Sequence, residues 1–236
     1  MFKYINFNGN MKIILIILLL ILILIVILIV IRCLHNFKEL CNESFNESTI
    51  DGDEIYIKLP HGAESSRYNY KTKECKHWYN LQFIERILEK KYNNVLMLGV
   101  ALGGIAVHLL DKNPNINITG VDISDKHFDI VKKYSDNTRL NLIKADANIY
   151  VLSSQQKFNV IICDIFLNST VPDFVLTKTF MDAIYNMLLP KGLFLINLIR
   201  VDETKIMNLI KDSFPDSTIE SKKHNGNFLI FVSLNN

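Results

Sequence analysis

The stretch VLMLGVALGG, residues 95–104, is the most informative part of this chain. Its first four residues, Val95–Leu98, are all apolar and predict a short buried strand. The small residues that follow predict a tight turn into a helix: Gly99, Ala101, Gly103 and Gly104. A buried strand that turns directly into a helix is the repeating unit of α/β folds, so we expect further units of the same kind downstream.

The sequence after this stretch continues the alternation of strands and helices. We expect further strands at residues 116–121, 139–144, 158–163 and 192–198. Helices are expected near residues 103–111, 125–135, 147–153, 174–189 and 203–214. The end of the chain, residues 217–234, has two strand-like runs around a Gly-bearing turn, which predicts an antiparallel hairpin. The pattern predicts an α/β fold with a mostly parallel sheet and a terminal antiparallel hairpin.

Acidic residues stand at the ends of three successive predicted strands. Asp122 ends ITGVD, Asp146 ends NLIKAD, and Asp164 ends FNVIICD. Ligands of parallel α/β sheets bind outside the carboxyl ends of the strands, so we expect the three carboxylates to meet in one crevice.

The turn and the first two carboxylates have the chemistry of a nucleotide-type cofactor site. Small residues let the backbone approach a ligand, and the following helix N-terminus favours an anion, although a variant dinucleotide turn has the same pattern. Asp122 can accept hydrogen bonds from ribose hydroxyls, and Asp146 from an adenine amino group. Each aspartate can instead cap the helix that follows. The neighbouring residues Ile123 and Ala147 are expected to contact the same cofactor.

Asp164 is the candidate catalytic residue, because it stands where the reacting end of a cofactor would lie. A carboxylate there can hold an acceptor group or take its proton, or it can only orient the following loop. His61, His77 and Trp78 precede the first core strand and either cover the crevice or serve as packing residues.

Charge and cysteine usage exclude several other classes. The formal net charge is +2 and no Lys/Arg run stands on a predicted helix face, so no nucleic-acid partner is expected. The four cysteines are scattered without a CxxC pair, so the sequence predicts neither a metal site nor a disulfide framework.

Several motifs together give the chain a resemblance to a known family. They are VLMLGVALGG, VDIS followed by DKHFDIVKKY, RLNLIKADANIYVL followed by KFNVIICDIF, and VPDFVLTKTFMDAIYNMLLPKGLFLINL. Over about residues 93–200 the chain resembles the spermidine synthase-like members of the class I S-adenosylmethionine-dependent methyltransferase superfamily. The resemblance implies a Rossmann-like seven-stranded methyltransferase fold, S-adenosylmethionine as the cofactor, and homodimers as a common assembly.

Two positions depart from the polyamine-making members of that family. Those enzymes carry aspartates that bind amines where this chain has Leu102 and Leu167. Without these charge partners a polycation would bind poorly. We therefore expect a methyltransferase acting on a small molecule or a protein. A polyamine aminopropyltransferase, a nicotinamide-dependent enzyme and a non-catalytic nucleotide-binding module remain alternatives.

The N-terminal part has a different composition from the rest. Residues 13–31 are nineteen uninterrupted aliphatic residues, roughly 28 Å as a helix, and predict a single transmembrane helix. No small-residue cleavage site follows, which argues against a signal peptide. The predicted organisation is a tail at 1–12, the transmembrane helix at 13–31, a linker at 32–52, a strand and helix extension at 53–92, and the methyltransferase-like domain at 93–236.

The orientation of this predicted anchor rests on the cofactor. Lys3 and Lys12 before the span are balanced by Arg32 and Lys38 after it, so the positive-inside rule does not discriminate. Because S-adenosylmethionine is made in the cytosol, we expect a membrane protein with its catalytic domain on the cytosolic side. The glycosylation sequons at Asn42 and Asn46 would then stay unmodified.

Overall fold

The computed structural model describes residues 16–32, 47–58, 64–90, 92–136, 138–167 and 169–235. The chain divides into two compact units, Met1–Ser44 and Phe45–Asn236. Of the first unit the structure describes one helix at residues 16–32, and its aliphatic side chains at 16–31 are between 46% and 60% exposed.

This helix corrects the membrane prediction. Within the residues that the structure describes, no helix is both long and apolar enough to cross a membrane. The predicted transmembrane helix at 13–31 is therefore wrong, and so are the single-pass anchor and the membrane localisation derived from it. Without a span, the predicted orientation of the catalytic domain relative to a membrane no longer applies. Residues 13–15, Asn42 and Asn46 lie outside the described residues.

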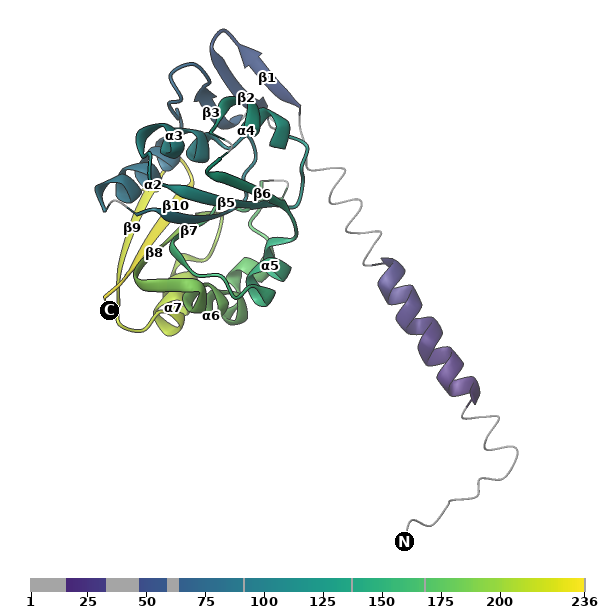
Figure 1. The fold of residues 1–236 in the computed structure, drawn as a ribbon. Coiled ribbons are helices and arrows are strands. Elements are labelled where there is room, and N and C mark those ends of the chain that lie inside the picture. The colour runs from purple at the N-terminus through teal and green to yellow at the C-terminus, as the bar shows by residue number, and fades with distance from the viewer. Residues whose placement is uncertain are drawn as a thin grey trace. The chain divides into compact units, whose positions relative to one another are not determined.

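The second unit is built on a seven-stranded sheet, with the order β6-β5-β4-β7-β8-β10-β9. Its strands are β4 (Asn94–Leu98), β5 (Asn117–Asp122), β6 (Leu140–Lys144), β7 (Phe158–Cys163), β8 (Leu188–Ile199), β9 (Ser217–His224) and β10 (Asn227–Leu234). The strands from β6 to β8 pair in parallel, and β10 enters antiparallel between β8 and β9 (Figure 1). The predicted Rossmann-like sheet with a terminal antiparallel hairpin is confirmed.

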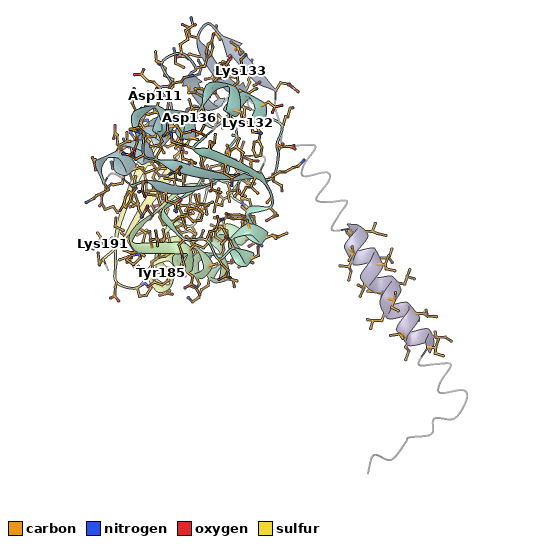
Figure 2. The ribbon with its side chains drawn as sticks, viewed as in Figure 1. Asp111, Lys132, Lys133, Asp136, Tyr185 and Lys191 are labelled. Carbon is orange, nitrogen blue, oxygen red and sulfur yellow. The ribbon has the colours of Figure 1, made fainter. Side chains whose placement is uncertain are left out.

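Helices cover both faces of this sheet. One face carries α2 (Trp78–Glu89), α3 (Gly104–Lys112) and α4 (Phe128–Tyr134), and the other carries α5 (Ala147–Ser153), α6 (Lys178–Met187) and α7 (Glu203–Ser213). In β4, Val95 and Met97 pack into the first layer while Leu96 and Leu98 pack into the second. Successive side chains of a strand point to opposite faces, so a strand that is apolar throughout must be covered on both sides. Figure 2 shows the labelled Lys133 of α4 and Tyr185 of α6 on opposite sides of the sheet.

Two predicted boundaries differ from the structure. The helix expected at 174–189 is divided into a 3₁₀ turn, η2 (Asp173–Leu176), and α6. Thr177 separates them, because its Oγ1 accepts a hydrogen bond from the backbone N–H of Phe180 at 3.3 Å and so caps the new helix. Strand β8 begins before the expected residue 192, since Pro190–Gly192 forms an irregularity within the strand instead of preceding it.

A second, three-stranded antiparallel sheet precedes α2. It consists of β1 (Ser48–Asp51), β2 (Glu54–Lys58) and β3 (Glu64–Asn69). Only the middle strand was expected, and β1 begins inside the range predicted as linker. The sequences STID and ESSRYN lack an apolar alternation, so only their pairing with β2 makes them strands.

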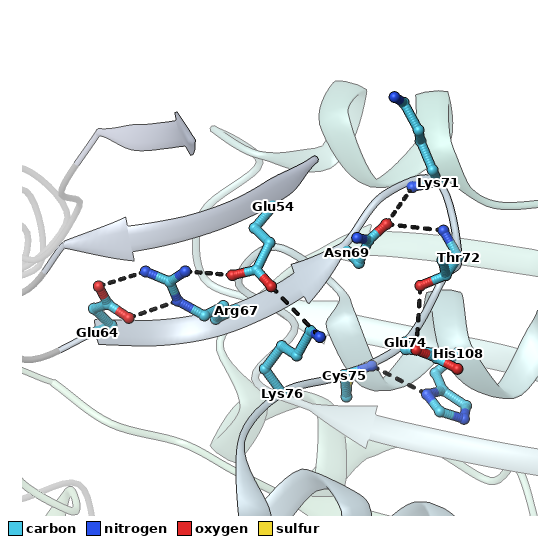
Figure 3. A network of polar contacts seen from close by, with 10 residues as sticks. All are labelled: Glu54, Glu64, Arg67, Asn69, Lys71, Thr72, Glu74, Cys75, Lys76 and His108. Carbon is cyan, nitrogen blue, oxygen red and sulfur yellow. Dashed lines mark hydrogen bonds and ion pairs between the residues drawn. The ribbon is translucent and has the colours of Figure 1, made fainter. Parts of the chain in front are cut away.

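Polar contacts stabilise this small sheet, and one more ties the segment after it to the main domain (Figure 3). The guanidinium of Arg67 donates to Glu64 at 2.6 Å and also pairs with Glu54. On the next segment, the buried backbone N–H of Cys75 donates to Nδ1 of His108 in α3 at 3.1 Å. Exposed ion pairs contribute little to stability, whereas a buried donor must find an acceptor. The Cys75–His108 contact therefore fastens the segment that leads into α2.

Candidate functional site

The candidate site lies where the strand order reverses. The chain runs from β4 outward to β5 and β6, then returns to the other side of β4 to form β7. In open α/β sheets, ligands bind outside the carboxyl ends of the strands at this switch point. The turn after β4, Asp122, Asp146 and Asp164 all follow strands that end at this edge, so the structure brings together the residues predicted from the sequence.

Gly99 lies between the two halves of the sheet. Its φ is +85°, and a Cβ atom at this position would lie 2.3 Å from the backbone oxygen of Asp164. Its own N–H donates to the carbonyl of Val121 at 2.9 Å, while the N–H of Asp164 donates to the carbonyl of Leu98 at 2.9 Å. A side chain here would collide with the end of β7, so glycine is required by the protein itself, with or without a ligand.

The other small residues of the turn have different surroundings. Gly103 (φ +69°) leaves 2.6 Å between an added Cβ and Val131 of α4, and Gly104 faces Cys75 and Tyr68 at 3.2 and 3.3 Å. Both glycines are buried, whereas Gly99 and Ala101 are partly exposed. The part of the turn whose backbone is exposed is therefore at Gly99 and Ala101. Contact between the cofactor and Gly103 or Gly104 stays a prediction.

Asp122 holds this turn in place. Its Oδ2 accepts from the N–H groups of Val100 and Ala101 at 2.8 and 3.0 Å, and its Oδ1 accepts from Ser124 at 3.0 Å. A carboxylate has about four lone-pair positions, so one position at Oδ1 remains for an external donor. The following Ile123 is partly exposed beside it.

Asp146 caps α5, which is the alternative that the sequence left open. Its Oδ1 accepts from the N–H groups of Asn148 and Ile149 at 2.7 and 3.2 Å. Within the described residues, Oδ2 has no hydrogen-bond partner, so capping leaves one oxygen for a ligand. Ala147 is 9% exposed and begins the helix. Capping and adenine recognition are therefore compatible at this residue.

Asp164 is held by a neighbouring strand, not by nearby backbone. It is partly buried at the end of β7, and its Oδ1 accepts from Nδ2 of Asn197 in β8 at 3.0 Å. Burial raises the pKa of the Asp164 carboxyl to about 6, against the opposing effect of the Asn197 hydrogen bond. A carboxyl that titrates near neutrality in a crevice can accept or release a proton under ordinary conditions.

Two residues near Asp164 were not predicted from the sequence. Asn197 is 2% exposed in β8, and no local pattern in the sequence marks it as a site residue. Burial, and after it the charge of Asp164, raises the pKa of the Tyr79 phenol well above its ordinary value. Tyr79 follows directly after His77 and Trp78 at the start of α2. The sequence therefore pointed to the correct segment, but to neighbouring residues instead of Tyr79.

The residues expected to cover the crevice are partly accounted for. His77 is half-buried and stacks on Tyr79 with ring centroids 5.4 Å apart, while Trp78 packs against His224 at 4.9 Å. His61 lies outside the described residues. In the part of the chain that the structure describes, no three His, Cys, Asp or Glu side chains gather as a metal site would require.

One comparison with known proteins matches part of this domain to a protein family. Residues 95–192 match the family model described as a methyltransferase domain. The domain has the class I methyltransferase fold. The match bears out the resemblance predicted from the sequence, and with it S-adenosylmethionine as the cofactor class of the methyltransferase-like domain.

The similar proteins and structures carry the names of two different activities. A probable polyamine aminopropyl transferase from Bifidobacterium longum is 28% identical over 153 residues, which are 64% of this chain and 34% of the relative. This chain therefore spans about a third of that relative's length. A probable spermidine synthase from Corynebacterium glutamicum superposes with a TM-score of 0.64 at 15% identity, covering 80% of each chain. Human methyltransferase-like protein 13, solved with SAH, has a TM-score of 0.55 at 20% identity, over 70% of this chain and 81% of its own. At these identities the two structures show the fold alone.

Proposed function

We propose that the protein transfers a methyl group from S-adenosylmethionine to a small-molecule or protein acceptor. The observation that carries this proposal is the grouping of three features at the switch point of the sheet. There, an open backbone turn, a ribose-type carboxylate and a carboxylate titrating near neutrality follow adjacent strands of a methyltransferase fold.

The residues present fit this cofactor. Gly99 and Ala101 are partly exposed and carry no more than a methyl side chain, so a ligand can approach their exposed backbone. Asp122 has one remaining acceptor position, enough for one ribose hydroxyl, and Asp146 has a free Oδ2 for an amino group. Ile123 and Ala147 supply apolar surface beside these two contacts.

The chemistry assigned to this chain's own residues is modest. S-adenosylmethionine supplies an activated methyl group, and the acceptor's lone pair forms the new bond to carbon while the bonding pair returns to sulfur. Asp164 would orient the acceptor and take the proton that the acceptor loses. Alignment of the two reactants contributes most of the acceleration that such a site can provide, with the proton transfer adding to it.

A polyamine aminopropyltransferase is the second candidate, favoured by the names of the Bifidobacterium relative and the Corynebacterium structure. Leu102 argues against it. Its side chain is fully buried in the core, so the turn offers no carboxylate to bind an amine. Leu167, in the turn after β7, likewise carries no charge.

Calorimetry on the full chain tests these candidates. Titrations with S-adenosylmethionine, its decarboxylated form and NAD should show the tightest binding for S-adenosylmethionine. Tighter binding of the decarboxylated form, with turnover of a diamine, would establish the second candidate instead. Binding of NAD alone would overturn both.

A substitution then separates catalysis from mere binding. Asp164→Asn should leave the affinity for S-adenosylmethionine within a few-fold of wild type and lower methyl transfer by about 100-fold or more. Unchanged transfer would remove Asp164 from the reaction. If wild type binds the cofactor but no acceptor is ever methylated, the domain is a non-catalytic binding module.

A further inference from the structure

We propose that Asn197 is a positioning residue for Asp164, which fixes one carboxylate oxygen and leaves the other to face the acceptor. This inference rests on the proposed function, because it concerns the group assigned to that reaction. It adds a residue from β8 to a site otherwise built from the turns after β4, β5, β6 and β7.

The geometry defines how Asn197 acts. Its Nδ2 lies 3.0 Å from Oδ1 of Asp164, and the two strands that carry these residues are paired through Cys163 and Ile196. An ionised carboxylate can only accept hydrogen bonds, so the amide must present its nitrogen to Asp164. Oδ1 of Asp164 is thereby held, while Oδ2 has no hydrogen-bond partner within the described residues.

The stability of the core does not explain an asparagine at this position. The segment LFLINLI of β8 is otherwise apolar, and Asn197 is 2% exposed within it. Its Oδ1 is buried without a hydrogen-bond partner among the described residues. An unsatisfied buried oxygen disfavours folding, and a leucine at this position would avoid that cost. The residue is therefore better explained by what its nitrogen does to Asp164.

The groups around Asp164 allow its protonation to be followed as a single titration near pH 6. The charge of Asp164 acts on two titratable groups, Tyr79 of α2 and Cys163 of β7, while β8 presents the neutral Asn197. Burial raises the pKa of both Tyr79 and Cys163, so both stay protonated near pH 6. His77, which stacks on Tyr79, is a further titratable group, and burial lowers its pKa. An NMR label on the aspartate carboxyl carbon does not report on the imidazole.

The test is a carboxyl-carbon NMR titration of the full chain labelled at aspartate, with Asp164→Asn identifying the resonance. In Asn197→Leu the midpoint of Asp164 should rise by at least half a pH unit, because the donor that favours the ionised form is gone. Asn197→Ser, whose side chain is too short to reach the carboxylate, should raise it in the same direction if the leucine variant does not fold. A midpoint within 0.2 units of wild type (roughly the error of such a titration) in either folded variant overturns the proposal.

A matched control comes from the other end of the sheet. Nδ2 of Asn94, at the start of β4, donates to the carbonyl of Lys157 at 2.8 Å. Asn94→Leu removes a comparable amide hydrogen bond far from the crevice, so the Asp164 midpoint should not move. A shift of equal size in this variant would mean that the titration reports general loosening of the sheet.

Thermal unfolding gives a second measurement. The Asn197 hydrogen bond is stronger when Asp164 is ionised, so the change in Tm caused by Asn197→Leu should be less favourable at pH 8 than at pH 5. An equal change at both pH values would indicate a merely structural residue. Failure of wild type to bind S-adenosylmethionine would overturn the proposed function, whereas an unmoved Asp164 midpoint overturns only the role of Asn197.

Discussion

The two sides of the switch point hold their carboxylates in different ways. After β5 and β6, Asp122 and Asp146 accept hydrogen bonds from backbone N–H groups of the turns around them. After β7, Asp164 is buried and accepts from one side-chain amide on a neighbouring strand. Backbone donors hold a carboxylate as a fixed acceptor, which suits recognition, while burial with a single donor leaves a proton exchangeable near neutral pH. The difference separates a cofactor-holding side from a reactive side.

The largest expected effect is at Gly99, where the two sides meet. Gly99→Ala should lower the free energy of unfolding by about 2–5 kcal/mol, because it combines left-handed backbone strain with an overlap against the carbonyl of Asp164. Denaturant unfolding measures this loss. Gly226→Ala is the matched control, since its φ is +83° but an added Cβ meets nothing within 4 Å. If both variants lose the same stability, the close approach of β7 to the turn contributes nothing.

The next effect concerns the cofactor-holding side. Asp122→Ala should weaken S-adenosylmethionine binding by about 1.5–3 kcal/mol, because the ribose loses an acceptor and the N–H groups of Val100 and Ala101 lose theirs. Calorimetry on the folded variant measures this. Asp125→Ala, which removes an exposed carboxylate paired with Lys144 at 3.0 Å, should leave the affinity unchanged. An unaltered dissociation constant in the Asp122 variant would refute the site assignment.

On the reactive side, we expect the substitution of Asp164 by asparagine to increase stability. The pKa of Asp164 is about 6 in the folded protein and about 3.9 in an unfolded chain, so folding becomes less favourable as pH rises between these values. Above pH 6 the cost is constant. Asp164→Asn should therefore raise the free energy of unfolding by about 1–2 kcal/mol at pH 7 and by little at pH 4, after allowance for partial exposure. Urea unfolding at the two pH values measures the difference, and a variant less stable at pH 7 than wild type would contradict the burial argument.

The smallest effect concerns the capping of α5 by Asp146. Asp146→Ala removes the cap of α5 and should lower stability by about 1 kcal/mol, whereas Asp146→Asn keeps a capping oxygen and should change it by a few tenths. Thermal unfolding of the two variants side by side measures this. Equal losses would show that charge, not the hydrogen bonds to Asn148 and Ile149, is what holds the helix end.

Local patterns in the sequence were sufficient for the framework of this protein. The apolar run before Gly99 and the later strand and helix periods specify βα units, and parallel units place Asp122, Asp146 and Asp164 at one edge. Capping by Asp146 was readable as well, because its partners Asn148 and Ile149 are two and three residues away. Such contacts lie within the range over which residue spacing carries information.

Contacts between distant segments could not be read in this way. Asn197 lies 33 residues from Asp164, and the charge of Asp164 acts on Tyr79 of α2. An added Cβ would lie 2.6 Å from Val131 at Gly103, and 3.2 and 3.3 Å from Cys75 and Tyr68 at Gly104. The polar strands β1 and β3 form only because they pair with β2. Aliphatic composition alone led to the prediction of a membrane span that the described helix at 16–32 does not bear out. Spacing along the chain determines which secondary structure forms, whereas burial, pairing and the partner of each carboxylate depend on which segments the folded sheet brings together.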